Sequence, residues 1–115
     1  MSQADASSRK KRLEGAAPVF AALGDETRLG LVARLSTGQA LSITRLTEGT
    51  ALTRQAITRH LEVLSDAGLV RSTRHGRKRL WELERARFEL ARRSLDQISD
   101  WWDGKLADLR AVVEG

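Results

Sequence analysis

The side chains of this chain that are best suited to bind a nucleic acid lie between Thr53 and Val70. Four of them supply two guanidinium groups, an amide and a hydroxyl, and these are Arg54, Gln55, Thr58 and Arg59. Such groups bind phosphates and the edges of bases in a major groove. The nearby apolar residues recur at spacings of three and four, which predicts an amphipathic helix. The apolar residues are Ala56, Ile57, Leu61, Leu64 and Ala67.

The ends of this helix are marked by residues with known preferences. Thr53 can accept a hydrogen bond from the free backbone N–H groups of the first turn. Gly68 tolerates the left-handed conformation that ends many helices. We therefore expect a helix over residues 53–67. Considered alone, an ordinary amphipathic helix with a solvated polar face explains the segment equally well.

A basic β-hairpin is expected directly after this helix. Residues 69–74 and 78–84 read as strands, and Gly76 lies where a tight turn is needed. The turn is flanked by four cations, which are Arg74, Arg77, Lys78 and Arg79. Like charges at this density are unfavourable unless an anion meets them. The hairpin, over residues 71–83, is therefore predicted to bind phosphates or the minor groove. The alternative is a charged tip that only keeps a sheet edge soluble.

The charge distribution supports a polyanionic partner. The net charge is +5, and residues 52–81 hold seven basic but only two acidic side chains. Residues 82–115 hold six basic and eight acidic side chains, so the excess is local. A local basic surface is the electrostatic footprint of a nucleic-acid-binding protein.

Length and composition exclude several classes of protein. The 115 residues suffice for one compact domain. The chain has no cysteine and only two histidines, so thiolate metal sites, disulfides and histidine clusters are not expected, and no cofactor is predicted. No apolar run is long enough to cross a membrane, and a cytoplasmic location is expected. An enzyme is disfavoured because the histidines, His60 and His75, lie outside any expected enclosed pocket.

The remaining elements complete a winged helix-turn-helix. Residues 1–12 are predicted to be a disordered basic tail, with a phosphate-binding arm as the alternative. Short helices are expected over residues 13–23 and 26–35, and a third begins at Ser42. The expected order is α-α-α-α-β-β-α, a mostly helical fold with a small β-hairpin, with residues 13–84 forming the DNA-binding domain.

Residues 85–115 are predicted to form one long dimerisation helix. Its apolar residues recur at spacings close to those of a coiled-coil seam, and a small domain cannot cover so long a seam. The expected interface residues are Phe88, Ala91, Leu95, Ile98, Trp102, Leu106, Leu109 and Val113, with Trp101 one position off the seam. An effector pocket between Phe20 and Trp101 or Trp102 is the alternative to a plain dimer core.

The chain resembles the ArsR/SmtB family of winged-helix repressors in four segments. They are residues 20–29, FAALGDETRL; residues 53–64, TRQAITRHLEVL; residues 67–70, AGLV; and Gly76-Arg77 with residues 81–83, WEL. This resemblance implies a homodimer whose recognition helices enter successive major grooves of a palindromic operator. It also implies repression by occluding a promoter, relieved by an inducer.

The chain departs from the metal-sensing members of that family. Where those members carry a cysteine pair, this chain has Ser42 and Thr44, and hydroxyls are poor ligands for soft metals. The last helix has aspartates but no histidine. It looks like a subgroup that does not use metal, so no metal site is predicted.

The sequence thus predicts a dimeric, sequence-specific transcriptional repressor that binds double-stranded DNA. The expected DNA-binding residues are Thr53, Arg54, Gln55, Thr58, Arg59, His60, Arg74, Arg77, Lys78 and Arg79. For His60, a packing role competes with a phosphate contact. The alternatives are a winged-helix module for protein interaction or dimerisation, or a regulator that responds to a small-molecule or protein effector, with DNA binding secondary.

Overall fold

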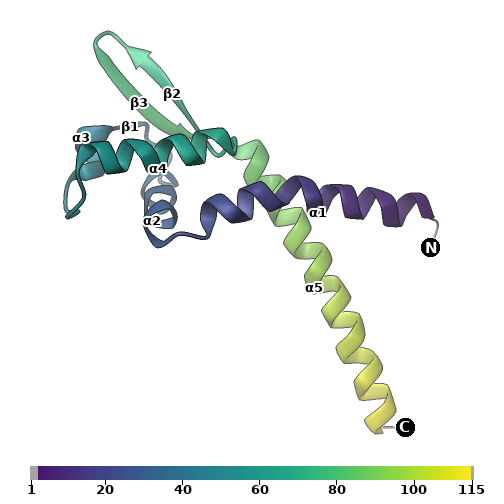
Figure 1. The fold of residues 1–115 in the computed structure, drawn as a ribbon. Helices are drawn as coiled ribbons and strands as arrows, with labels where there is room; N and C mark the ends of the chain where they lie inside the picture. Colours follow the sequence, from purple (N-terminus) through teal and green to yellow (C-terminus); the bar gives the residue numbers. More distant parts are fainter. Residues whose placement is uncertain (1–2, 115) are drawn as a thin grey trace.

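A compact head and two projecting helices make up the molecule. The computed structural model describes residues 3–114, with overall dimensions of 66 × 30 × 21 Å. Figure 1 shows that α1 and α5 cross each other and extend away from the head, which contains α2, α3, α4 and the sheet. In order, the elements are α1 (Gln3–Leu23), α2 (Glu26–Leu35), β1 (Leu41–Ser42), α3 (Ile43–Thr47), α4 (Arg54–Asp66), β2 (Val70–His75), β3 (Lys78–Leu83) and α5 (Arg85–Glu114).

The first helix begins ten residues earlier than the sequence predicted. Residues 3–12 continue α1 without a break, so the prediction of a disordered tail is wrong for them, while residues 1–2 lie outside the described residues. This segment contains neither glycine nor proline, and Lys10 lies 4.0 Å from Glu14 one turn later. Composition alone suggested disorder because the segment is polar, but its residues are compatible with a helix.

Three helices begin with side-chain caps. Asp25, Ser42 and Thr53 each accept a hydrogen bond from the backbone N–H three residues later, at 2.9, 3.3 and 3.1 Å. These bonds satisfy donors that have no partner inside the helix. The predicted cap at Thr53 is therefore confirmed, and α4 starts at Arg54.

The sheet has three strands, one more than expected. β2 and β3 form the predicted hairpin, with Gly76 at the turn in a left-handed conformation, φ +65°. The two-residue strand β1 pairs antiparallel with β3, Leu41 opposite Trp81 and Ser42 opposite Leu80. The strand order is therefore β1-β3-β2. β1 is too short to leave an alternating pattern in the sequence.

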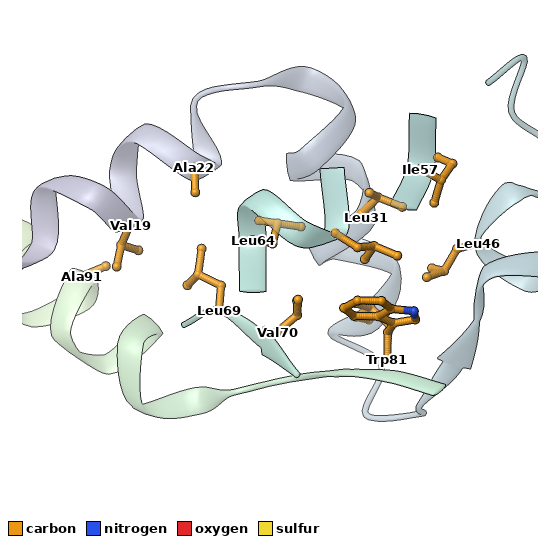
Figure 2. Close-up of a cluster of buried hydrophobic side chains, with 12 residues drawn as sticks. Val19, Ala22, Leu31, Leu46, Ile57, Leu64, Leu69, Val70, Trp81 and Ala91 are labelled. Atoms are coloured by element: carbon orange, nitrogen blue, oxygen red, sulfur yellow. The ribbon is translucent and has the colours of Figure 1, made fainter. Parts of the chain in front are cut away.

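One continuous apolar core joins the head to the crossing of α1 and α5. Trp81 is only 2% exposed and lies at one end of this core beside Leu46, while Val19 and Ala91 lie at the other end (Figure 2). Leu64 and Leu69, both fully buried, lie between these ends (Figure 2). Burial of such side chains is the main contribution to stability in a domain of this size. The core fixes the orientation of α4 relative to both the sheet and α5.

Candidate nucleic-acid interface

The recognition helix α4 has one buried and one exposed face. Ile57, Leu61 and Leu64 have no exposed surface and pack into the core. The long polar side chains Arg54 and Arg59 lie on the exposed part of the helix. Gln55 is also exposed, whereas Thr58 is partly buried. The division expected from the spacing of the apolar residues is therefore present.

Two hydrogen bonds organise the start of this helix. Nη2 of Arg54 donates to Oγ1 of Thr44 in α3 at 2.9 Å. Oγ1 of Thr58 donates to the carbonyl oxygen of Arg54 at 2.8 Å, so the hydroxyl proton of Thr58 is already engaged. The polar side of α4 borders a surface hollow of about 430 Å³. Its lining residues are Ile43, Arg54, Gln55, Thr58, Arg59 and Glu62.

His60 lies among side chains of the neighbouring helix. Its side chain is 25% exposed, and Nδ1 lies 3.4 Å from Nη1 of Arg28 and 3.9 Å from Oδ2 of Asp25. Arg28 in turn donates from Nε to the carbonyl oxygen of Ala22 at 2.6 Å. These contacts favour the packing interpretation of His60 over a phosphate contact. Asp25 and Arg28, the polar residues at the boundary between α1 and α2, therefore have partners in α1 and α4.

We define the wing as β2, β3 and the turn that connects them. The tip of the wing is strongly basic. Arg74, Arg77 and Lys78 are exposed, and Arg74 lies directly opposite Arg79 in the register. No acidic residue lies between Arg74 and Arg79 along the chain. Like charges in directly opposed positions repel each other. The tip therefore presents positive charge that an anion can neutralise.

Arg79 is directed differently from the other cations of the wing. Its Nε donates to Oγ of Ser72 at 2.9 Å, and its guanidinium lies 4.9 Å from the ring centroid of Trp81. Both contacts hold this side chain against the sheet. Arg79 therefore has a structural role, and its phosphate contact stays a prediction.

Arg71, at the base of the wing, is paired within the chain. Nε lies 2.8 Å from Oε1 of Glu82, and Nη1 lies 3.2 Å from Oε2 of Glu84. The hydrogen bond to Glu82, supported by both carboxylate charges, raises the pKa of Arg71 above its ordinary value. The two carboxylates neutralise the charge of Arg71 locally, so the base of the wing is less positively charged than its tip.

A groove of about 490 Å³ connects the wing to α3. Its polar lining comes from Ser42, Thr44 and Arg45 on one side and from Lys78 and Arg79 on the other, with Ile43 also contributing. Arg45 is exposed and lies 3.7 Å from Glu48. The groove brings a cation of α3 to the same surface as the wing, although more than thirty positions separate them in sequence. Sequence spacing gives no direct signal of such a juxtaposition.

The predicted dimer seam on α5 divides into two parts. Ala91 is 6% exposed, whereas Phe88 packs against the core but stays partly exposed. α1 packs against α5, so Ala91 is buried within the chain itself, and a role of Ala91 or Phe88 in a dimer interface stays a prediction. Further along, the seam is exposed, and the exposed residues are Leu95, Ile98, Trp101, Trp102, Leu106, Leu109 and Val113.

The two tryptophans on α5 lie beyond its crossing with α1. Their rings meet edge to face with centroids 5.3 Å apart, and Nζ of Lys105 lies 5.6 Å from the centroid of Trp101. Both rings remain more than half exposed. Phe20, the expected partner in an effector pocket, instead packs against the core of the head.

Neither a metal-binding cluster nor a membrane-spanning helix is found in the part of the chain that the structure describes. Within residues 3–114, no three His, Cys, Asp or Glu side chains lie close enough to hold a metal ion. None of the helices in that range combines the length and apolarity needed to span a bilayer.

Comparison with known proteins gives a consistent result. Residues 23–73 match a family described as a helix-turn-helix domain. The chain is 44% identical over 68 residues to an uncharacterised HTH-type transcriptional regulator, YuzN, of Bacillus subtilis (strain 168). That alignment covers 54% of this chain and 74% of YuzN.

Two solved structures extend the likeness to nearly the whole chain. An ArsR-like transcriptional regulator from Rhodococcus sp. RHA1 is 34% identical with a TM-score of 0.73, over 87% of this chain and 93% of that one. A second ArsR-family transcriptional regulator is 26% identical with a TM-score of 0.68, over 82% of this chain and 93% of that one.

The helix-turn-helix, the basic wing and these relatives together define a winged-helix protein that binds DNA and regulates transcription. The chain belongs to the ArsR/SmtB-type family of these regulators, as its sequence resemblance predicted.

Proposed function

We propose that this regulator is a homodimeric repressor that occupies a palindromic operator. The observation that carries the proposal is the shared exposure of two cationic elements, the face of α4 with Arg54 and Arg59 and the wing tip with Arg77 and Lys78. A helix in the major groove and a hairpin beside it can contact one half-site together. Repression follows because a protein bound across a promoter excludes the polymerase.

The exposed apolar stripe of α5 supports the homodimer. Leu106 and Leu109 are 49% and 60% exposed, and Val113 is 84% exposed, on a helix that projects from the head (Figure 1). An apolar stripe of this length is unfavourable in water and is buried when two copies associate around a twofold axis. A twofold dimer in turn requires an operator with two inverted half-sites.

We further propose that metal ions do not control this repressor. Ser42 and Thr44 stand where a soft-metal sensor of the family has thiolates. Oγ of Ser42 accepts from the backbone of Arg45, and Oγ1 of Thr44 accepts from Arg54. Both oxygens thus have structural partners, and hydroxyls bind soft metals poorly.

Footprinting on the promoter of its own gene tests the proposal. We expect protection of an inverted repeat whose half-site centres lie one helical turn of DNA, or a multiple of it, apart. Transcription from that promoter in vitro should fall as the protein is added, and a chelator should not change the binding. Protection of a single half-site would contradict the dimer. Activation of transcription, or no binding at low salt, would contradict the repressor.

A further inference from the structure

Glu62 is an acidic residue on an otherwise cationic surface. It is exposed on α4 and lines the same hollow as Arg54, Gln55, Thr58 and Arg59. Relative to Arg54, these residues follow at one, four, five and eight positions, which places all of them on one side of a helix with 3.6 residues per turn. Glu62 therefore belongs to the surface of α4 that faces the DNA in the proposed complex.

This carboxylate is not used to stabilise the protein. Within residues 3–114, neither a hydrogen bond nor an ion pair engages its side chain, although Arg59 lies one turn earlier on the same helix. Some other glutamates are paired, as Glu82 is with Arg71 and Glu89 is with Arg92. The carboxylate of Glu62 is thus available to a ligand.

The polar stripe extends over the first nine residues of α4. Eight positions from Arg54 to Glu62 correspond to ~12 Å along the helix axis, so the stripe passes more than one base pair, while the major groove, about 12 Å wide, admits the helix itself. An ionised carboxylate can only accept hydrogen bonds, and it is repelled by phosphates. In a major groove, the donors that it can meet are the exocyclic amino groups of cytosine and adenine, and cytosine is the usual partner of glutamate.

We propose that Glu62 is a specificity-determining residue that accepts a hydrogen bond from the amino group of a cytosine in each operator half-site. This inference rests on the proposed binding of α4 in the major groove. Arg54 and Arg59, which only donate, favour acceptor-rich guanine edges. Glu62 supplies the opposite preference at the far end of the same stripe.

Selection of binding sites from random duplex DNA tests the proposal. The full-length wild-type protein should select a half-site with one cytosine that the Glu62→Ala variant no longer requires, with a roughly tenfold loss of discrimination at that base pair. Glu62→Gln should shift the preference at the same position towards adenine, because an amide pairs with the adenine edge. Asp66→Asn is the matched control: it removes one negative charge from the same helix outside the hollow and should leave the selected sequence unchanged.

The outcomes separate the inference from the function on which it rests. If both Glu62 variants select the wild-type sequence and bind all DNA more tightly, the carboxylate only repels phosphates and the proposal is overturned. If the wild-type protein selects no sequence at all, the proposed operator binding itself fails. Circular dichroism of each variant confirms that the helix remains folded before selection is interpreted.

Discussion

Nη1 of Arg28 lies 3.4 Å from Nδ1 of His60, and this contact joins the first turn of α2 to the middle of the recognition helix. Because Nε of Arg28 also donates to the carbonyl oxygen of Ala22, one guanidinium connects α1, α2 and α4. The orientation of α4 relative to α1 and α2 thus depends on the contact between these two side chains.

Replacement of His60 distinguishes a packing role from a DNA contact. His60→Ala should lower the free energy of unfolding by about 1 kcal/mol, since it removes a partly buried hydrogen-bond partner. His75→Ala, at the exposed hairpin tip, should leave stability unchanged. Urea denaturation measures both. Unchanged stability together with weaker DNA binding for His60→Ala would instead make this residue a DNA contact.

The cations of the wing tip should determine the salt dependence of DNA binding. Replacing both Arg77 and Lys78 by alanine should flatten the slope of log K against log salt by about 2, since each lost phosphate contact removes about 0.9 from the slope. Fluorescence anisotropy with labelled duplex DNA between low and moderate salt measures this slope. Arg93→Ala, which removes an exposed cation from α5, serves as the control. An unchanged slope in the double variant would remove the wing from the contact surface.

Arg79 should contribute more to stability than its neighbours. Arg79→Ala removes the stacking on Trp81 and the hydrogen bond to Ser72, and should lower the free energy of unfolding by about 0.5–1 kcal/mol. Arg77→Ala should not change it. Arg79→Lys keeps the charge but loses the planar group, so most of the loss should remain. Equal stability of all three variants would show that the contacts of Arg79 contribute nothing.

Stability should depend on the ionisation of Asp25. The backbone N–H of Arg28 donates to its carboxylate, and this bond, with nearby positive charge, lowers the pKa of Asp25 below its ordinary value of 3.8. The ionised form therefore stabilises the fold above pH 3.8, and this contribution is lost as the pH falls through the lowered pKa.

Denaturation of Asp25→Ala at pH 7 and pH 3 tests this dependence. The variant should be less stable than the wild type at pH 7, and the difference should shrink at pH 3, because below pH 3.8 the Asp25 carboxyl of the unfolded chain is mostly protonated while the folded state favours the ionised form. Ser42→Ala removes a cap that does not titrate, so its effect should be the same at both pH values. A constant difference for Asp25→Ala would contradict the electrostatic explanation.

Charge placed on the exposed stripe of α5 should dissociate the proposed dimer. Leu109→Glu buries a carboxylate in the expected seam, which is unfavourable without a partner. Ala111→Glu places the same group on the opposite side of the helix and is the matched control. Analytical ultracentrifugation should give a monomer for the first variant and a dimer for the second. Two dimers of equal stability would show that association uses another surface.

Local residue chemistry predicted the recognition helix and the wing well. Thr53 caps α4 and Gly76 forms the turn, because a hydroxyl cap and a left-handed glycine are requirements that a short segment meets by itself. Gly68 likewise adopts φ +77° after α4, where an added Cβ would lie 3.0 Å from the side chain of Arg87.

Contacts between distant segments were not predictable in the same way. Ala91 continues the periodicity of the exposed seam, and only the packing of α1 on α5 shows that it is buried within the chain. The pairing of Leu41 with Trp81 also joins segments forty positions apart. The exposed cations Arg77 and Arg79 look alike in sequence, but the partners of Arg79 come from the folded sheet.

The short strand β1 makes the wing and the helix-turn-helix one mechanical unit. Ser42 pairs with Leu80 of the wing and, at the same position, caps α3, whose Thr44 holds the guanidinium of Arg54. A tilt of the hairpin would therefore displace the start of α3 and, through it, the guanidinium of Arg54. In the proposed dimer, each protomer would therefore approach DNA with the wing and α4 held rigidly together, and adaptation to operators with different half-site spacing would depend on the angle between the two protomers.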